Sequence, residues 1–329
     1  MRPRVAITVG DPRGIGPEIV SKVLENAPGG ADYLVVGPKE CVAGLPGERI
    51  ILGELGTESG AGLGSESSEG VGQTPAHGLS TPEPVPRSPL QLSPAAAGRL
   101  VGLQVKKAVS LALAGTVDAI VTGPAEKKAL QLAGFRYPGH TEWLGELAGG
   151  VPTTMMLVAG KLRVVLITTH IALREVPESV TRERILTAAR HTERALRDWW
   201  GISEPRIAVC ALNPHAGDSG IFGVEDDEVL APAAREIGAA GPLPADTVFV
   251  KALRGEFDAV LAPYHDVGMT AVKVAGFGKG VNVTLGLPFI RTAPDHGTAL
   301  DIAGQGIADP GSMRQAVLLA VELVRRRVS

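Results

Sequence analysis

Residues Asp258-Ala-Val-Leu-Ala-Pro-Tyr-His-Asp-Val-Gly268 contain a short apolar run that leads directly into Tyr264, His265 and Asp266. A short apolar run bounded by Pro and Gly is typical of a parallel strand that is covered on both faces. Ligands of open α/β sheets gather outside the carboxyl ends of the strands. The stretch therefore predicts an α/β fold with His265 and Asp266 in a candidate site.

Two other apolar runs also end in a histidine. Residues 162–169 lead to His170, and residues 206–214 lead to His215. Three of the seven histidines thus follow predicted strand ends, and imidazole is a common ligand of divalent metals. The pattern predicts a metal site formed by His170, His215 and His265.

Length and composition restrict the class of protein. A chain of 329 residues exceeds the usual single core, so we expect two domains or lobes. The formal net charge is −3 and the basic residues are scattered, which argues against nucleic-acid binding. No apolar run approaches the roughly 20 residues that cross a bilayer, and the amino terminus lacks the apolar core of a signal peptide. With only two cysteines, we expect a cytoplasmic protein without disulfides.

The amino-terminal part predicts a strand, a glycine-rich turn and a helix. Residues 4–9 predict the strand, and Gly10-Asp-Pro-Arg-Gly-Ile-Gly-Pro-Glu18 predicts the turn, with Pro17 in the first turn of the helix. The turn lacks the last glycine of the dinucleotide fingerprint. It is either a plain structural turn or a place where the backbone approaches a ligand.

A change of composition follows. Residues 53–94 are rich in Gly, Ser, Pro and Glu, which predicts a weakly structured segment. A helix is predicted from about residue 94 to residue 114, with an apolar face that includes Leu103 and Val105.

The second half contains further local predictions. Residues 153–169 predict a hairpin, and Thr181 is the predicted cap of a long amphipathic helix in which His191 is a surface residue. Residues 241–247 contain two prolines and predict a rigid turn that carries Asp246.

Several polar residues are candidates for binding an anionic group. His140 and Thr141 precede a helical segment, where they favour an anion, although Thr141 can equally act as a simple cap. Lys273, Asn282 and Arg291 could converge on the same kind of group, Arg as a fork and Lys as a point charge.

An ordered set of motifs over nearly the whole chain resembles the 4-hydroxythreonine-4-phosphate dehydrogenase family of pyridoxal phosphate biosynthesis. The motifs are Gly10-Asp-Pro-Arg-Gly-Ile-Gly-Pro-Glu18, Thr122-Gly-Pro124, Gly139-His-Thr141, Thr168-Thr-His170, Leu212-Asn-Pro-His-Ala-Gly217, Pro242-Leu-Pro-Ala-Asp-Thr247, Tyr264-His-Asp266 and Gly286-Leu-Pro-Phe-Ile-Arg-Thr292. Residues 296–310 are also similar to the adenosine-binding loop of the isopropylmalate and isocitrate dehydrogenases, whose fold this family shares.

The resemblance implies a two-lobed α/β fold of the isocitrate and isopropylmalate dehydrogenase type, with the active site in the cleft between the lobes. Residues 1–138 and 291–329 would form the lobe with the cofactor loop. Residues 139–290 would form the lobe with the metal ligands and the dimer interface. The implied cofactor contacts are His296, Gly297, Thr298 and Asp301.

The resemblance also implies NAD or NADP as cofactor and a divalent metal, with zinc foremost and magnesium or cobalt as alternatives. The protein would be a homodimer with a shared active site, in which His265 comes from the partner subunit. No nucleic acid or membrane partner is expected. The implied substrate contacts are His140, Thr141, Lys273, Asn282 and Arg291.

The implied reaction oxidises 4-phosphooxy-threonine (4-hydroxythreonine 4-phosphate) to a β-keto acid, which decarboxylates to 3-amino-2-oxopropyl phosphate. A metal that binds the substrate hydroxyl lowers its pKa and so favours hydride transfer to the nicotinamide. Asp246 and Asp266 are candidate catalytic residues that orient an imidazole or relay a proton, or else they have structural roles only. The alternatives are a catabolic 4-phosphothreonate dehydrogenase and a non-catalytic homologue that keeps the metal and ligand pocket.

Three departures from the family pattern leave the substrate open. Arg13 stands where the family usually has a small residue, and Ala125-Glu126 replaces a different dipeptide before Lys127. The stretch 53–94 does not match the family convincingly.

Overall fold

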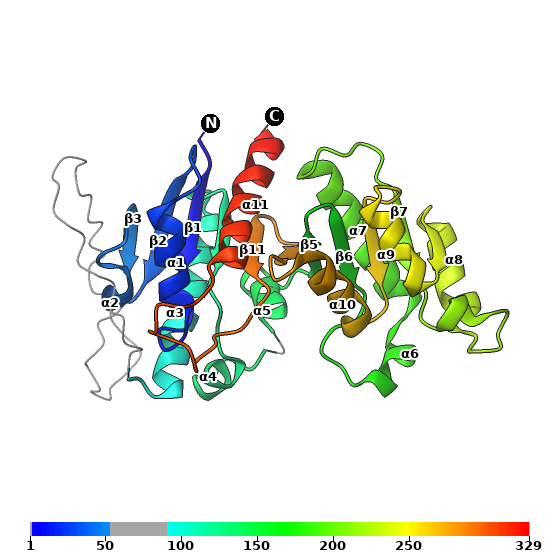
Figure 1. Ribbon diagram of the computed structural model, residues 1–329, viewed down its shortest axis with the longest axis horizontal. Coiled ribbons are helices and arrows are strands. Elements are labelled where there is room, and N and C mark those ends of the chain that lie inside the picture. The colour runs from blue at the N-terminus through cyan, green and yellow to red at the C-terminus, as the bar shows by residue number, and fades with distance from the viewer. Residues whose placement is uncertain (1, 53–90, 138, 329) are drawn as a thin grey trace. The chain divides into compact units, whose positions relative to one another are not determined.

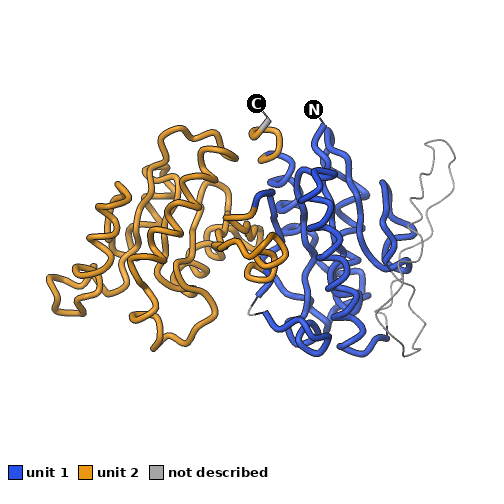
Figure 2. The backbone as a smooth tube through the Cα atoms, turned by 180° about the vertical axis from the view of Figure 1, so that it is seen from behind, with its two compact units in different colours: residues 1–140, 288–322 blue, residues 141–287, 323–329 orange. Residues whose placement is uncertain are grey.

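The computed structural model describes residues 2–52, 91–137 and 139–328 (Figure 1). Residues 53–90, most of the segment for which the sequence predicts weak structure, lie outside this description. The chain forms two compact units (Figure 2). Unit 1 comprises residues 1–140 and 288–322, and unit 2 comprises residues 141–287 and 323–329.

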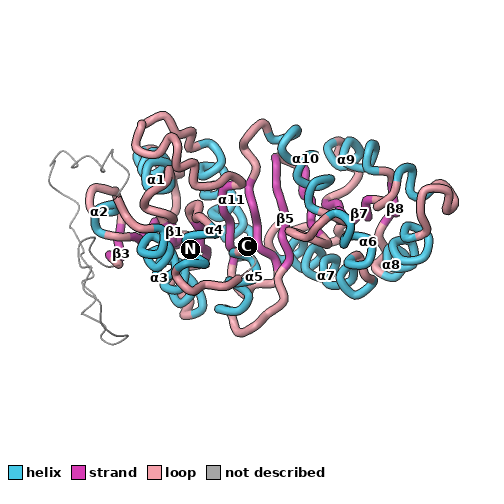
Figure 3. The backbone as a smooth tube through the Cα atoms, turned by 90° about the horizontal axis from the view of Figure 1, so that it is seen from below, coloured by secondary structure: helices cyan, strands magenta, loops and turns pink. Residues whose placement is uncertain are grey.

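Unit 1 contains parallel strands in the order β3, β2, β1, β4 and β11. Their bounds are β1 Arg4–Thr8, β2 Asp32–Gly37, β3 Glu48–Ile51, β4 Ala119–Thr122 and β11 Ile290–Pro294. The helices that accompany them are α1 Gly16–Glu25, α2 Lys39–Val42, α3 Pro94–Leu113 and α4 Lys127–Leu132. Helices α1 and α3 lie on opposite sides of the strands (Figure 3). The predicted first strand, glycine-rich turn and helix with Pro17 at its start are confirmed.

Helix α3 begins where the sequence predicts it and buries Val105 as expected, but it does not bury Leu103. The Ser93 hydroxyl accepts a hydrogen bond from the Ala96 N–H and caps the helix. Leu103 was expected in the apolar face and is 50% exposed, whereas Gln104 is fully buried. That part of the prediction is wrong, because Gln104 turns inward to bond the backbone at Gly10 with both ends of its amide.

Unit 2 contains strands in the order β10, β5, β6, β9, β7 and β8. Strand β5 is antiparallel to both β10 and β6, and the pairs β6–β9, β9–β7 and β7–β8 are parallel. The bounds are β5 Thr154–Ala159, β6 Leu162–Leu166, β7 Ile207–Cys210, β8 Ala240–Leu243, β9 Ala259–Ala262 and β10 Val281–Leu285. The predicted hairpin is β5–β6, and the predicted parallel strand before Tyr264 is β9, with all four residues buried.

The longer helices of unit 2 cover both faces of these strands. Helices α9 and α10 lie on one side, and α7 and α8 lie on the other (Figure 3). The bounds of the helices are α5 His140–Leu147, α6 Val176–Ser179, α7 Arg182–Asp198, α8 Ala231–Glu236, α9 Ala245–Leu253 and α10 His265–Gly276, with short helical turns at Leu173–Glu175, Pro214–Gly217 and Asp226–Leu230. The last helix, α11 Gly311–Val328, lies mostly in unit 1. Thr181 caps α7 by accepting a hydrogen bond from the Arg184 N–H, as predicted.

Two local predictions in unit 2 are wrong. Residues 241–247 do not form a turn, because residues 240–243 are strand β8 and Asp246 lies in the first turn of α9. Strand β8 pairs on one side only, and prolines are tolerated in such an edge strand. His191 is half-buried instead of exposed, and its Nδ1 lies 2.8 Å from the Thr154 hydroxyl.

Other global expectations can be compared with the described residues. Cys41 and Cys210 are both buried and form no disulfide, as predicted. Within residues 2–52, 91–137 and 139–328, no helix is both long and apolar enough to cross a membrane.

Candidate functional site

Three neighbouring parallel strands of unit 2 end beside one another and carry the three predicted metal ligands. Strand β9 lies between β6 and β7, so the segments that follow the three strands leave the same edge of the sheet. His170 follows β6, His265 follows β9 and His215 follows β7. The ends of β6 and β9 are joined further, because the buried Thr168 hydroxyl donates to the Pro263 carbonyl at 2.7 Å.

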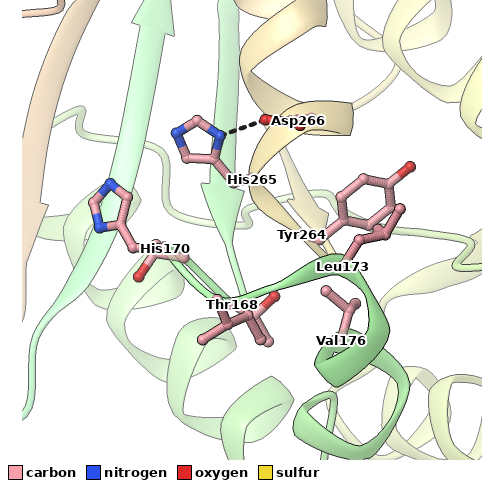
Figure 4. A pocket seen from close by; sticks show the side chains of 9 residues that line it. Thr168, His170, Leu173, Val176, Tyr264, His265 and Asp266 are labelled. Carbon is pink, nitrogen blue, oxygen red and sulfur yellow. Dashed lines mark hydrogen bonds and ion pairs between the residues drawn. The ribbon is translucent and has the colours of Figure 1, made fainter.

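His170 and His265 form a close pair in a pocket at this edge (Figure 4). Their ring centroids are 5.5 Å apart. The pocket is lined by residues 168–171, Leu173 and Val176 after β6 and by residues 264–266 after β9. His265 begins α10 and lies between His170 and Asp266 in Figure 4. The pocket therefore brings together two of the three predicted ligands and one of the two predicted catalytic carboxylates.

The contact with Asp266 selects one tautomer of a neutral His265 ring. The His265 Nδ1 lies 2.7 Å from Asp266 Oδ1, and an ionised carboxylate can only accept a hydrogen bond. Nδ1 of the neutral ring must then carry the proton, so the lone pair is on Nε2. A carboxylate that holds a histidine in this way is a common partner of a metal-binding imidazole.

The histidine pair fits a shared divalent metal. Two imidazoles that bind one tetrahedral metal through nitrogens at about 2.0–2.1 Å have ring centroids roughly 5 Å apart, close to the separation seen here. His215 is exposed on a turn with a left-handed φ of 54° and does not complete the set. Among the described residues of the single chain, no three His, Cys, Asp or Glu side chains are arranged as a metal site. Within the described residues, the chain therefore brings two of the three predicted imidazoles together.

Asp246, the other predicted catalytic carboxylate, does not lie in the pocket with Asp266. Its side chain is exposed in the first turn of α9. Of the two predicted carboxylates, only Asp266 hydrogen-bonds to one of the three histidines within the described part of the chain. Asp266 itself is 86% exposed, so solvent reaches the carboxylate that holds His265.

Two of the residues predicted to bind an anionic group, Arg291 and His140, lie in unit 1. Arg291 is buried on β11, and its Nε and Nη2 both donate to the Thr122 hydroxyl, at 3.2 and 2.7 Å. Burial lowers the pKa of Arg291 to about 10. Burial, and then the positive charge of Arg291, lower the pKa of His140 to about 3, so its ring is neutral at pH 7.

The low pKa of His140 predicts a pH dependence of stability. His140 binds a proton near pH 6.5 in the unfolded chain but only near pH 3 in the folded chain. The free energy of unfolding therefore does not depend on His140 well above pH 6.5, and it falls as the pH drops from about 6.5 towards 3. Between pH 7 and pH 5 the loss should be about 2 kcal/mol. Urea unfolding of wild type and His140→Gln at both pH values measures it, and an equal pH dependence in both proteins would contradict it.

The sequence analysis missed the role of Thr122 in this group. Thr122 was recognised only as part of a motif, yet its hydroxyl is the acceptor that orients the Arg291 fork. Its position in the sequence could have indicated this role, because Thr122 is the last residue of β4, and β9 likewise ends shortly before His265.

The other predicted substrate contacts belong to unit 2. Thr141 is buried in the first turn of α5, and its carbonyl accepts a hydrogen bond from the Thr153 hydroxyl at 3.1 Å. Asn282 lies on β10, and its buried Oδ1 has no hydrogen-bond partner among the described residues. Lys273 is exposed in the last turn of α10. Asn282 therefore has a free acceptor for a ligand, and Lys273 offers a solvated charge.

The predicted cofactor residues lie on the loop between β11 and α11. The His296 Nδ1 is 3.0 Å from the Gly297 carbonyl, and its buried Nε2 has no partner among the described residues. Gly297 has open space where a side chain would be. Thr298 accepts a backbone hydrogen bond from Ile15, and Asp301 is exposed. An unsatisfied ring nitrogen beside accessible backbone fits the binding of a polar cofactor.

Residues 73–320 match the family model described as pyridoxal phosphate biosynthetic protein PdxA. The chain belongs to this family. The family resemblance inferred from the sequence motifs is thereby confirmed.

Two PdxA relatives illustrate the range of named activities. The chain is 44% identical to a 4-hydroxythreonine-4-phosphate dehydrogenase of Geobacter metallireducens, over 98% of this chain and 96% of that protein. It is 41% identical to a D-threonate 4-phosphate dehydrogenase of Pectobacterium atrosepticum, over 97% of this chain and 98% of that protein. Both relatives are named as dehydrogenases, and the chain is an oxidoreductase of the PdxA family.

A solved structure confirms the predicted α/β fold of the PdxA family. The 1.25 Å crystal structure of 4-hydroxythreonine-4-phosphate dehydrogenase from Klebsiella pneumoniae superposes with a TM-score of 0.77 at 39% identity. The match covers 98% of both chains.

Proposed function

We propose that this PdxA family member oxidises a hydroxyl group of a small phosphorylated hydroxy acid with NAD or NADP, with the help of a divalent metal. The observation that carries the proposal is the set of His170, His265 and Asp266 at adjacent strand ends. Oxidation of 4-phosphooxy-threonine at the carbon β to its carboxylate would give a β-keto acid, which then loses carbon dioxide to give 3-amino-2-oxopropyl phosphate.

Two substrates share the chemistry that the site recognises. The names of the relatives differ in the acid, hydroxythreonine or threonate, but both contain a 4-phosphate. The buried guanidinium of Arg291 supports binding of such a phosphate, because Arg forms paired, charge-assisted hydrogen bonds to its oxygens. We take 4-phosphooxy-threonine as the first candidate and 4-phosphothreonate, the acid of the Pectobacterium relative, as the second.

Asp266, His265 and His140 would have different roles in the proposed reaction. When bound, a divalent metal supplies a Lewis acid that lowers the pKa of the substrate hydroxyl and polarises the carbonyl of the oxidised acid. Asp266 holds the His265 ring with Nε2 free to bind that metal, and it can pass a proton to solvent because it is exposed. His140 stays neutral near Arg291 and can donate or accept a hydrogen bond without opposing the charge of an anion.

We further propose that the protein acts as a homodimer with a shared metal site. The resemblance implies that His265 comes from the partner subunit, but the spacing of His170 and His265 within one chain favours these two as ligands from the same subunit. His215 of the partner subunit would then be the third ligand. The exposed turn that carries His215 is followed by an apolar segment with Ile221 73% exposed, which suits an element that meets another subunit.

Cofactor reduction with a substrate panel tests the proposed function. Reduction of NAD and of NADP would be followed at 25 °C with 4-phosphooxy-threonine, 4-phosphothreonate and their dephosphorylated forms. We expect turnover with a phosphorylated substrate, its loss after chelation, and recovery with zinc, magnesium or cobalt. A protein that is stabilised by the substrates but never reduces a cofactor would be the non-catalytic homologue. Full activity after exhaustive chelation would contradict the metal proposal.

A further inference from the structure

The turn between β1 and α1 contacts the candidate cofactor loop directly. The Ile15 N–H donates to the Thr298 carbonyl at 2.9 Å. At Gly14, a Cβ would lie 2.6 Å from the same carbonyl oxygen, too close for any side chain. The position of the Thr298 backbone is therefore set by the position of the turn.

Arg13, inside this turn, joins two carboxylates. Its Nε and Nη2 bond the two oxygens of Asp11 at 3.1 and 2.7 Å, and Nη2 also lies 2.7 Å from Glu126 Oε2. Asp11 is fully buried, and Arg13 is 12% exposed. Glu126 is the residue immediately before α4. The triad thus connects the middle of the turn to the start of α4, the helix that follows β4 in the chain.

The first residue of the turn is held by a separate contact. The Gln104 amide accepts from the Gly10 N–H at 2.9 Å and donates to the Gly10 carbonyl at 3.0 Å. Gly10 has a left-handed φ of 78°. With Gly10 fixed by α3, the remaining freedom of the turn lies in the residues that follow, and Arg13 restrains these.

We propose that Arg13 is a positioning residue for the cofactor: through Asp11 and Glu126 it fixes the turn against which Thr298 rests. The proposal rests on the proposed nicotinamide-dependent function. Arg13 acts through the backbone of Gly14 and Ile15 and is not assigned a contact with the cofactor. The structure joins Arg13 and Glu126 in one ion pair.

The direct test is the dissociation constant of NAD and NADP for the full-length protein, measured by calorimetry. Arg13→Ala should weaken binding of the functional cofactor about 10-fold or more, because small displacements of binding groups have effects of this size. The KM for the cofactor should rise with it, while kcat at saturating cofactor changes little. Thermal unfolding reports how much of the variant is folded.

Two further variants separate positioning from general stability. Glu126→Gln should have a smaller effect, and the double variant should bind no more weakly than Arg13→Ala, because Glu126 acts through Arg13. Glu48→Gln is the matched control, since it breaks the Arg4–Glu48 ion pair at the opposite end of β1, and it should leave cofactor binding unchanged.

The outcomes are distinct. A dissociation constant for Arg13→Ala within about twofold of wild type would overturn the inference. If Arg13→Ala does not fold, unchanged binding by both Arg13→Lys and Glu126→Gln would overturn it instead. If the wild-type protein binds neither NAD nor NADP, the proposed function itself fails, and the inference fails with it.

Discussion

Replacing His170 or His265 with Ala should lower kcat/KM by about 1000-fold or more while the protein remains folded. Binding of a substrate oxygen to a metal contributes several kcal/mol to transition-state stabilisation, and each 1.4 kcal/mol corresponds to about tenfold in rate. Asp266→Asn should have a smaller effect, about 10- to 100-fold, because Asp266 acts through His265. Steady-state kinetics, metal content and thermal unfolding of the three variants provide the test. Near-wild-type rates in either histidine variant would contradict the site.

Mixing of inactive variants tests how the site is shared between subunits. If His215 of the partner subunit completes the site, a His170→Ala chain mixed with a His215→Ala chain should regain about a quarter of the activity, because half the dimers are mixed and each has one intact site. A mixture of His170→Ala with His265→Ala should stay inactive, since each chain then lacks one member of the pair. The opposite pattern would place His265 across the interface, and no recovery in either mixture would place the metal within one subunit.

Arg291→Ala should raise the KM for the phosphorylated substrate about 10- to 150-fold, which corresponds to the loss of about 1.5–3 kcal/mol of charge-assisted hydrogen bonding. The KM for the dephosphorylated analogue should change little. Arg291→Lys keeps the positive charge but loses the paired N–H donors of the guanidinium, so its KM should lie between those of the wild type and Arg291→Ala. The measurement is steady-state kinetics with both substrates.

Two comparisons make the Arg291 experiment specific. Thr122→Val removes the hydroxyl that accepts from Nε and Nη2 of Arg291, and it should raise the same KM by a smaller factor. Lys273→Ala, at an exposed position, should act more weakly than Arg291→Ala, because solvent screens its charge. Equal losses of affinity for the phosphorylated and dephosphorylated substrates would argue against phosphate binding by Arg291.

The β9 strand and the histidine pair were predictable because local sequence determines them. The run of apolar residues in β9 must be buried, and parallel strands place their carboxyl ends at one edge of a sheet. His170 and His265 follow two such strands that are neighbours, and their side chains meet. The family motifs added the cofactor loop, which no periodicity indicates.

Other features depend on tertiary contacts that a single sequence does not contain. Gln104 is buried because it bonds both backbone groups of Gly10, which shifts the buried face of α3 away from Leu103. Strand β8 exists because residues 240–243 pair with β7, although their prolines and glycine favour a turn. The failure of His215 to join the other two histidines within one chain is likewise set by its turn and not by its distance along the sequence.

The position of β9 between β6 and β7 also determines when the proposed metal site could form during synthesis of the protein. Strands β6 and β7 leave the ribosome first, carrying His170 and His215, but they are not neighbours in the finished sheet. The partner of His170 arrives only when β9 is translated and takes its place between them. A metal held by this pair, as proposed, could therefore be bound only after β9 has joined β6, and a nascent chain that ends before His265 could not present the histidine pair.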